Sequence, residues 1–202
     1  MKLTFYTNPR SRGAIVRWML EEVGAPYDTV VLDYGPPMKT PEHRALNPMG
    51  KVPVLVAGDQ VVTEAAAICA FLADAFPAAG LAPPPARRGA YYRWLFFGAG
   101  PVEAAVTNQS LGVEVPEDRR GMVGYGSFDT MLATLEKAVS VAPYLAGDAF
   151  SAADVYTGSQ IGWGLQFGTL PPTPALTAYW DRVKDRPARR RAAEIDGILT
   201  EG

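Results

Sequence analysis

Glu64 stands at the start of a helical segment whose first turn is Ala65, Ala66 and Ala67. The first amide groups of a helix have no partner inside the helix, and the positive end of its dipole lies beside them. A carboxylate held there can grip a ligand ammonium group while the Ala65 amide meets a ligand carboxylate. That pairing is typical of a site for an amino-acid head group. The alternative is a glutamate that only stabilises the helix dipole.

A proline interrupts the apolar run Val52-Pro53-Val54-Leu55, where a strand is expected. Proline cannot donate to the ladder of a sheet, so the strand must bend or begin there. A cis Val52-Pro53 bond is one solution, because the cis form costs only ~0.5–1 kcal/mol before proline. The Val52 backbone would then face outward, where an extended peptide can pair with it. The alternative is a trans proline at the first residue of the strand.

The turn TNPRSRGA, residues 7–14, carries a third group of candidate residues between an expected strand and an expected helix. Ligands of β-α-β units bind at this end of the strands. Ser11 places a hydroxyl beside the amides of the helix start, and Arg12 adds a permanent cation. Lowering a thiol pKa by two units from ~8.5 takes about 2.7 kcal/mol, which one charge-assisted hydrogen bond and a helix end can supply. Ser11 and Arg12 are therefore candidates for stabilising a thiolate, unless Ser11 is only a helix cap.

The pattern of apolar residues predicts the elements that must position these groups. The expected elements are a strand at 2–6, a helix at 14–23, a strand at 28–32, strands at 52–57 and 60–63, and a helix at 65–76. Gly24 ends the first helix, and Gly58-Asp59 is a two-residue hairpin turn. Residues 33–46 are polar and predict a loop with a short irregular helix. The order is strand, helix, strand, loop, two strands and helix.

Residues 79–89 are rich in proline, glycine and alanine and are typical of a linker. We therefore predict one domain over residues 1–78 and a second over residues 90–202. No convincing strand pattern occurs in the second half, whereas apolar residues recur there at helical spacing, so the second domain is expected to be all-helical. Ser151 and Asp154 fit a capping box at the start of one of its helices.

The composition excludes several classes of function. A net charge of -2 gives no electrostatic basis for nucleic-acid binding. With one cysteine, Cys69, and one histidine, His43, the chain cannot form an internal disulfide or a zinc site of histidines and cysteines. Cys69 lies in an apolar helical stripe and is expected in the core. The uncharged residues 155–180 contain prolines and glycines that argue against a membrane span, and the N-terminus lacks a signal-peptide core, so a cytoplasmic protein is expected.

Four stretches, in this order, resemble the cytosolic glutathione S-transferase family, of bacterial type: FYTNPRSRGAIVRWMLEEVGAPY, NPMGKVPVL, VVTEAAAICAFL and YLAGDAFSAADV. The resemblance covers essentially the whole chain. It implies an α/β thioredoxin-like N-terminal domain, an all-α C-terminal domain and a homodimer. It also implies transfer of the glutathione thiolate to apolar electrophiles, as in detoxification, without a metal. Two alternatives stay open: a non-catalytic protein that binds glutathione or a hydrophobic ligand, and a glutathione-dependent peroxidase or dehalogenase.

The resemblance also implies roles for individual residues. The Val52 backbone would pair with the cysteinyl part of glutathione across a cis Pro53. Glu64 would hold the γ-glutamyl ammonium group, and Lys51 would lie near the glycyl carboxylate. Ala65 keeps the backbone donor for the γ-glutamyl carboxylate but lacks the hydroxyl of the serine that is common there. Weaker glutathione binding is therefore expected.

For the thiolate donor the resemblance leaves Ser11 as first choice, with Thr7 and Tyr6 in reserve. Arg12 is placed in the glutathione site, where beta-type members of the family carry cysteine, so disulfide-forming chemistry is not expected. The electrophile site is expected between the two domains. Five aromatic residues of the second domain are expected either to wall it or to be simple core: Tyr91, Trp94, Phe97, Trp163 and Phe167.

Overall fold

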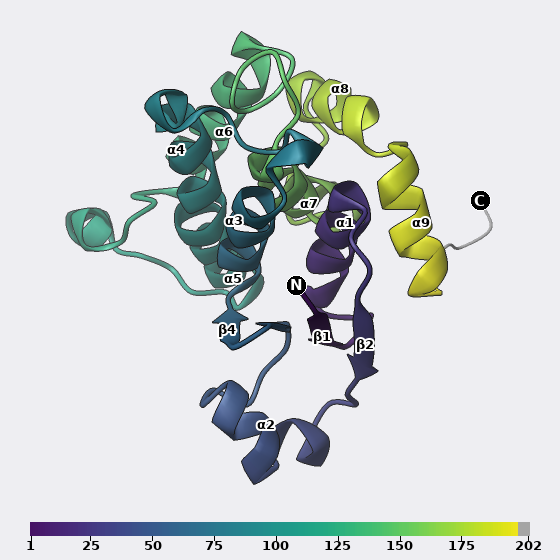
Figure 1. The fold of residues 1–202 in the computed structure, drawn as a ribbon. Coiled ribbons are helices and arrows are strands. Elements are labelled where there is room, and N and C mark those ends of the chain that lie inside the picture. Colours follow the sequence, from purple (N-terminus) through teal and green to yellow (C-terminus); the bar gives the residue numbers. More distant parts are fainter. Residues whose placement is uncertain (198–202) are drawn as a thin grey trace. The chain divides into compact units, whose positions relative to one another are not determined.

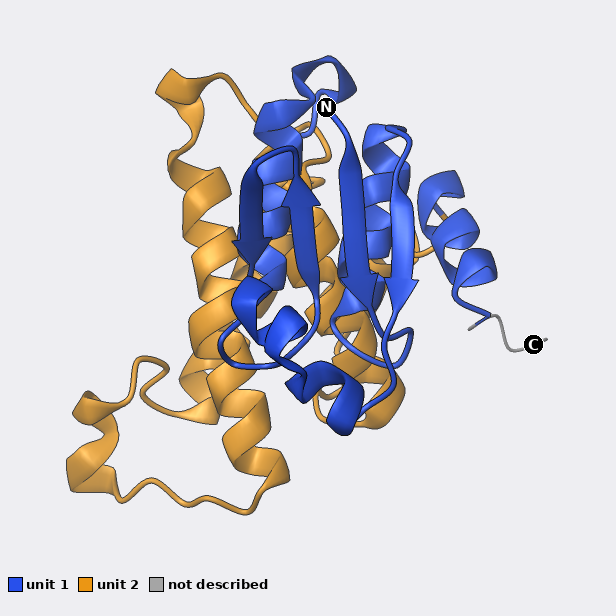
Figure 2. Cartoon of the chain, turned by 60° about the horizontal axis from the view of Figure 1, so that its bottom comes forward, with its two compact units in different colours: residues 1–81, 186–202 blue, residues 82–185 orange. Residues whose placement is uncertain are grey.

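The computed structural model describes residues 1–197, which form two compact units, shown in Figure 2. The first unit comprises residues 1–81 and the segment from Arg186 onward, and the second comprises residues 82–185. The elements of the first unit are β1 Leu3–Thr7, α1 Gly13–Val23, β2 Asp28–Val31, η1 Pro36–Lys39, α2 Pro41–Leu46, β3 Val54–Ala57, β4 Gln60–Thr63, α3 Ala65–Ala75, η2 Pro77–Ala79 and α9 Pro187–Ile195 (Figure 1).

The first unit is built on a four-stranded sheet of order β2-β1-β3-β4. β1 pairs with β2 in parallel and with β3 antiparallel, and β3 continues into β4 through the predicted hairpin. α1 and α3 pack against each other on one face of the sheet (Figure 2). Phe5 and Leu55, paired across β1 and β3, are fully buried beneath them. This is the thioredoxin-like arrangement that was expected, and the prediction is confirmed.

The helix end, the hairpin turn and the short helix of the first unit occur at the positions predicted from the sequence. Gly24 ends α1 in the left-handed conformation, with a φ of 67°. Gly58 takes a φ of 65° in the hairpin turn. The polar stretch 33–46 holds η1 and α2, and Thr40 caps α2 by accepting from the His43 amide at 3.3 Å. The predicted short helix in this stretch is therefore present.

The second unit is helical. Its elements are η3 Pro85–Arg87, α4 Gly89–Phe97, η4 Gly98–Val102, α5 Glu103–Ser110, η5 Glu117–Met122, α6 Phe128–Val141, α7 Ala152–Phe167 and α8 Pro174–Val183. η4 is a π-helical turn that contains Pro101 and lies between α4 and α5. Proline removes one amide donor from a helix, which explains the irregular turn. The prediction of an all-helical second half is confirmed for this unit.

The capping box at the start of α7 is present and anchors the core of the second unit. Asp154 is fully buried and accepts from the Ser151 amide at 2.9 Å, the Leu145 amide at 2.8 Å and the Tyr179 hydroxyl at 2.8 Å. Burial raises the pKa of Asp154, and these donors oppose that rise. The carboxylate thereby joins the start of α7, the preceding loop and α8.

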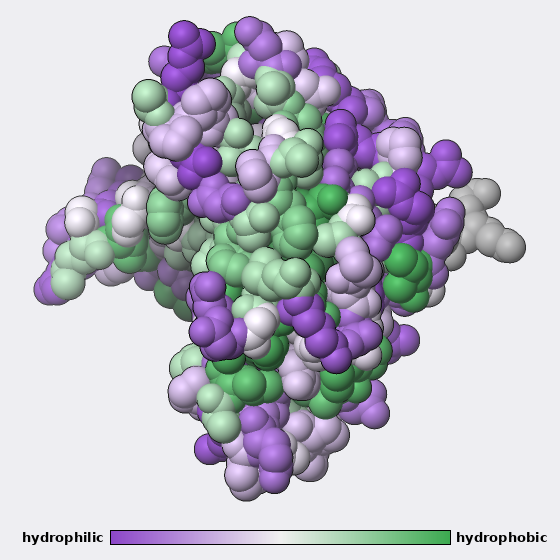
Figure 3. All heavy atoms as spheres, viewed as in Figure 1, coloured by the Kyte–Doolittle hydropathy of each residue, from purple (hydrophilic) through white to green (hydrophobic). Residues whose placement is uncertain are grey.

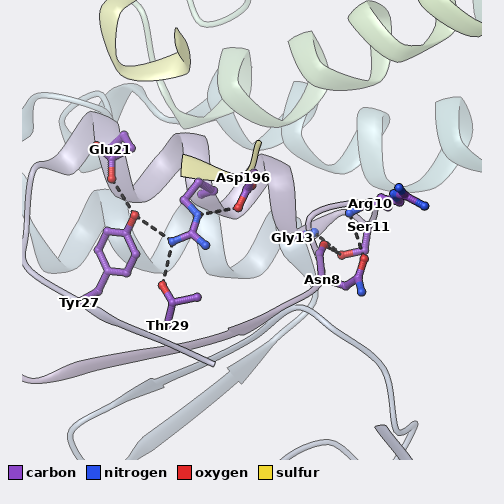
Figure 4. A network of polar contacts seen from close by, with 9 residues as sticks. Asn8, Arg10, Ser11, Gly13, Glu21, Tyr27, Thr29 and Asp196 are labelled. Carbon is purple, nitrogen blue, oxygen red and sulfur yellow. Dashed lines mark hydrogen bonds and ion pairs between the residues drawn. The ribbon is translucent and has the colours of Figure 1, made fainter. Parts of the chain in front are cut away.

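α9 packs on α1 and belongs to the first unit, whereas the predicted second domain ran on to residue 202. The physical reason is electrostatic: the Arg17 guanidinium, buried in α1, forms an ion pair with Asp196 at 3.0 Å. Arg17 also donates to the Tyr27 hydroxyl at 3.1 Å and to Thr29 at 2.8 Å (Figure 4). Burial raises the pKa of Tyr27 to about 12, so its hydroxyl keeps its proton and donates to Glu21.

The segment between α5 and α6, residues 111–127, contributes little to the core of the second unit. Leu111 and Met122 are more than 70% exposed. In Figure 3, where this segment lies at the left, hydrophobic and hydrophilic residues stand side by side on it. Among residues 1–197, no helix is long and apolar enough to cross a membrane.

Candidate functional site

The register of the sheet brings the three candidate segments to one edge of the first unit. Val54 pairs with Tyr6 of β1 on one side and with Thr63 of β4 on the other. The turn after β1, the residues before β3 and the residue after β4 therefore leave the sheet at the same edge. Ser11 follows β1, Pro53 precedes β3, and Glu64 follows β4 directly. The sequence predicted each segment, and the strand pairing assembles them.

Ser11 is half-buried in the turn between β1 and α1, and its hydroxyl is held by two contacts (Figure 4). Its Oγ donates to the Asn8 carbonyl oxygen at 2.7 Å and accepts from the Gly13 amide at 2.9 Å. Asn8 is itself fixed, because its Nδ2 donates to the Leu32 carbonyl at 2.9 Å. Ser11 lies one residue before the N-cap residue, Arg12, and its contact to the first amide of α1 resembles that of a helix-capping serine, which was the alternative to a catalytic one. A hydroxyl can turn about its C–O bond, so this geometry also suits a donor that exchanges Asn8 for a ligand.

The reserve residues lie close to this turn. Thr7 ends β1 and is fully buried, and within residues 1–197 its hydroxyl has no hydrogen-bond partner. The hydroxyl is directed at Gly13, where a side chain would collide with it, so the turn needs a glycine there. Tyr6 is half-buried, with its ring centroid 6.0 Å from that of His43. Arg12 is exposed at the start of α1.

The Val52-Pro53 peptide bond is cis, as the family resemblance implied, and the trans alternative is wrong. Pro53 is buried directly before β3, while Val52 is half-buried and Lys51 is exposed. No hydrogen bond within residues 1–197 engages the backbone N–H or C=O of Val52. An extended ligand can therefore pair with this residue as a further strand would.

Glu64 is the one non-glycine residue with a positive φ among residues 1–197; its φ is 64° and its ψ is 117°. Such a backbone costs on the order of 1–3 kcal/mol for a residue with a Cβ. The side chain is exposed, and it makes no capping bond to α3. The amides of Ala65 and Ala66 are the first of α3 and have no partner in the preceding turn of the helix. The arrangement presents a carboxylate and helix amides together, as a site for an amino-acid head group requires.

Sequence reasoning missed the side chains that hold the loop before Val52. The Lys51 carbonyl oxygen accepts from His43 Nε2 and from Asn47 Nδ2, each at 3.0 Å. Lys39 Nζ donates to the Gly50 carbonyl at 2.7 Å and to the Met49 carbonyl at 3.2 Å. Asn47, in the turn sequence NPMG, gave a signal of its own, since asparagine side chains often bond the backbone of turns. His43 and Lys39 gave no such signal, because their partners lie 8 to 11 residues further along the chain and belong to no recurring motif.

Cys69 lies in α3 and is fully buried, as expected for a core residue. Burial raises the pKa of its thiol, so it is not a nucleophile of this site. Among the aromatic residues proposed for an electrophile site, Tyr91 and Trp94 are buried in the second unit, and Phe167 is 70% exposed. Among residues 1–197, no cluster of three or more histidine, cysteine, aspartate or glutamate side chains could hold a metal ion.

Two protein-family models match the chain, one after the other. The model of the glutathione S-transferase N-terminal domain matches residues 13–75, and that of the C-terminal domain matches residues 127–187. Together the two matches cover more than half of the chain. The chain belongs to the glutathione S-transferase family. The resemblance inferred from the four sequence stretches is thus confirmed.

Members of the family from bacteria and plants match nearly the full chain. A glutathione S-transferase of Xanthomonas campestris is 26% identical over 211 residues, which span 98% of this chain and 100% of the relative. One of Arabidopsis thaliana is 28% identical over 205 residues, with 93% of this chain and 94% of the relative covered. Residues 76–126 lie between the two family matches and include residues 111–126 of the segment between α5 and α6.

Solved structures of the family agree in fold. The glutathione S-transferase from Xylella fastidiosa superposes with a TM-score of 0.80 at 26% identity, covering 98% of this chain and 100% of that one. A sphingomonad glutathione S-transferase, solved in complex with glutathione, has a TM-score of 0.76 at 27% identity, with coverages of 97% and 100%. The two-part architecture of this chain is therefore that of the family.

Proposed function

We propose that the protein is a glutathione S-transferase that binds glutathione at the sheet edge of the first unit and transfers its thiolate to apolar electrophiles. The observation that carries the proposal is the pairing of Val54 with both Tyr6 and Thr63, which brings the Ser11 turn, Val52 and Glu64 to that edge. Glutathione has an amino-acid head group, a peptide-like middle and a thiol. The three segments offer one partner for each.

In this assignment the open backbone of Val52 pairs with the cysteinyl part, as in β-strand addition. Glu64 holds the γ-glutamyl ammonium, and the Ala65 amide meets the γ-glutamyl carboxylate at the start of α3. The exposed ammonium of Lys51 is one residue from Val52, where it can meet the glycyl carboxylate. Ala65 lacks a hydroxyl for the γ-glutamyl carboxylate, so the affinity is expected to be modest.

Catalysis in this proposal consists of stabilising the thiolate and holding it against the electrophile. Ser11 donates a hydrogen bond to the sulfur after releasing the Asn8 carbonyl, and the positive end of α1 adds its field. Arg12, exposed beside it, contributes a cation. The thiolate then attacks the electrophilic carbon, and the leaving group departs with the electron pair.

The test is a pH titration of the ultraviolet absorbance of the thiolate, with glutathione bound to the wild-type protein, together with conjugation of chlorodinitrobenzene. We expect the bound thiol to titrate well below the free thiol, whose pKa is ~8.5, and the conjugation rate to exceed the uncatalysed rate. Absence of glutathione binding in calorimetry would overturn the assignment of the site. Binding with an unshifted thiol and no conjugation would overturn the catalytic part alone.

A second candidate function is a binding protein without catalysis. Two observations are compatible with it: the Ser11 hydroxyl already donates to Asn8, and Ala65 offers the ligand no hydroxyl. The relatives, which are named as transferases, favour the enzyme instead. The titration separates the two, because only the enzyme needs a lowered thiol pKa. Peroxide and haloalkane substrates, assayed with the same preparation, distinguish transfer from glutathione-dependent reduction and dehalogenation.

We further propose that the protein acts as a homodimer in the cytoplasm, in detoxification of apolar electrophiles. The proposal rests on membership of the family. Light scattering coupled to size-exclusion chromatography measures the mass directly: twice the 21.7 kDa of one chain supports the dimer, and a single-chain mass excludes it.

A further inference from the structure

We propose that His43, acting with Asn47, is a positioning residue for glutathione: the two side chains hold the Lys51 carbonyl so that the Val52 amide is aimed at the ligand and strengthened as a donor. The inference rests on the proposed function, because it assigns the ligand's cysteinyl carbonyl as the acceptor. It adds two residues of α2 and its C-terminal end to a site otherwise formed by the sheet edge.

The last three carbonyls before Val52 are taken by side chains from η1, from α2 and from the residue that ends α2. His43 Nε2 and Asn47 Nδ2 both reach the Lys51 carbonyl oxygen, each at 3.0 Å. Lys39 Nζ reaches the two preceding carbonyls, at 2.7 Å from Gly50 and 3.2 Å from Met49. Three consecutive carbonyls are thereby held, which fixes the plane of the Lys51–Val52 peptide group.

The direction of the Val52 amide follows from that plane. The one cis peptide bond among residues 1–197 is Val52-Pro53, so the Lys51–Val52 bond is trans. In a planar trans peptide, the C=O and the N–H point in opposite directions. With the Lys51 oxygen directed at His43 and Asn47, the Val52 N–H must point away from them. Among residues 1–197 it has no acceptor, so it is available to a ligand.

The strength of that amide follows from the two donors. A carbonyl that accepts hydrogen bonds becomes more polarised, and the N–H of the same peptide group becomes a better donor. Two donors on one carbonyl increase this effect over a single one. The Val52 N–H is therefore expected to bond a ligand carbonyl more strongly than an ordinary exposed amide would.

Burying His43 at its position costs free energy, which indicates that its side chain does more than fill space. Its ring is only 4% exposed, and its Nδ1 has no hydrogen-bond partner within residues 1–197. Because the Lys51 carbonyl can only accept, Nε2 carries the proton and Nδ1 is left as a buried acceptor. Leaving a buried polar atom unpaired is unfavourable, and an aliphatic side chain would avoid it. What an aliphatic side chain cannot do is donate to Lys51.

Three variants test the inference. His43→Leu removes the donor at similar volume, and His43→Gln restores an N–H near the place of Nε2. Thr40→Ala is the matched control: it removes the cap of α2, whose Oγ1 accepts from the His43 amide, and leaves both donors to Lys51 in place. All three destabilise or perturb α2, but only His43→Leu removes a donor from the carbonyl.

We expect His43→Leu to raise the Kd and the KM for glutathione roughly tenfold, the loss of about 1.4 kcal/mol in binding. Turnover at saturating glutathione should stay near that of the wild type, because the thiolate donor is untouched. His43→Gln should recover most of the affinity, and Thr40→Ala should lower thermal stability with little effect on Kd. In the ligand-free protein, the Val52 amide proton should move upfield in His43→Leu and not in Thr40→Ala.

Equal losses of affinity in Thr40→Ala and His43→Leu would overturn the inference, since the cause would then be the stability of α2. So would an unchanged Kd in a folded His43→Leu protein. If that variant does not fold, ring nitrogen shifts of the wild type decide the matter, because a proton on Nδ1 and none on Nε2 is incompatible with donation to Lys51. Failure of the wild type to bind glutathione would instead refute the proposed function, and the calorimetry of the wild type reports that separately.

Discussion

The Ser11 hydroxyl donates to the Asn8 carbonyl oxygen across 2.7 Å, so its proton is already engaged within the chain. The same oxygen accepts from the Gly13 amide, which makes Ser11 part of the fold as well as a candidate for chemistry. A thiolate is a charged acceptor, and charge-assisted hydrogen bonds are stronger than neutral ones. Bound glutathione therefore has a physical means of drawing the proton away from Asn8.

Ser11→Ala should separate these two roles. We expect a loss of about 1 kcal/mol in the free energy of unfolding, as for other capping serines. We also expect the pKa of the bound thiol to return to that of free glutathione, with a corresponding loss of conjugation rate. Ser127→Ala is the control, because Ser127 caps α6 by accepting from the Thr130 amide and lies in the other unit.

Urea unfolding and the thiolate titration check both effects. If the two variants lose similar stability and the bound thiol keeps its lowered pKa in Ser11→Ala, then Ser11 is only a cap. The donor would then be sought at Thr7, whose buried hydroxyl is unpaired within residues 1–197, or at Tyr6.

The backbone of Glu64 is strained, while its side chain is expected to bind glutathione. Substitutions at this position should therefore change stability and affinity in different ways. Glycine adopts a positive φ without strain, whereas Glu64→Ala keeps the strain. The free energy of unfolding of Glu64→Gly should therefore be about 1 kcal/mol larger than that of Glu64→Ala. Both variants lose the carboxylate, so both should bind glutathione on the order of tenfold to a hundredfold more weakly. Chemical denaturation and calorimetry measure the two quantities. Equal stabilities would disprove the strain, and an unchanged affinity would remove Glu64 from the site.

Much of the first unit was predictable because its determinants are short. The proline after Val52 restricts the backbone, and the glycines at positions 24 and 58 permit the positive φ of a helix end and a hairpin turn, whatever lies elsewhere in the chain. The alternation and helical spacing of apolar residues then fixed the order of strands and helices. The same holds in the second unit for the Ser151 to Asp154 capping box, whose partners are three residues apart.

The rest depended on partners far apart in sequence. Arg17 and Asp196 are separated by 179 residues, so no local pattern could place α9 on α1. Gly98 lies against Thr157, where a Cβ on residue 98 would collide, so this close approach also joins residues far apart in sequence. In the candidate site, the sequence singled out Val52 and Glu64 but not the donors of His43 and Lys39, because the loop containing those two was expected to be irregular.

The buried pair of Arg17 and Asp196 should be costly to break and less costly to replace. Each side chain is at most 3% exposed, so Asp196→Leu leaves a buried guanidinium without its counter-charge. We expect a loss of about 3–5 kcal/mol from that single change. The double variant Arg17→Met with Asp196→Leu should recover part of it, because neither charge is then buried. The exposed pair of Lys2 and Asp28 is the control, and Lys2→Met should have little effect.

Thermal and urea unfolding of the four proteins provide the measurement. A double variant no more stable than Asp196→Leu would mean that the contacts of Arg17 to Tyr27 and Thr29, which Arg17→Met also removes, outweigh the gain from removing the buried charge. Protection of α9 amides in hydrogen exchange gives an independent reading, because it reports the local opening of this helix.

Cys69 should be unreactive in the native protein. Its thiol is fully buried in α3, and burial raises its pKa because the thiolate would lose its hydration. A raised pKa means a smaller thiolate fraction at every pH below it, so raising the pH to ~9, where a free thiol is largely ionised, should leave native labelling slow. Labelling with a disulfide reagent should become fast only in denaturant.

Ser140→Cys, at an exposed position of α6, is the positive control and should add one rapidly labelled thiol. Rapid labelling of the native wild type would show that α3 opens readily, and would return Cys69 to the set of candidate nucleophiles.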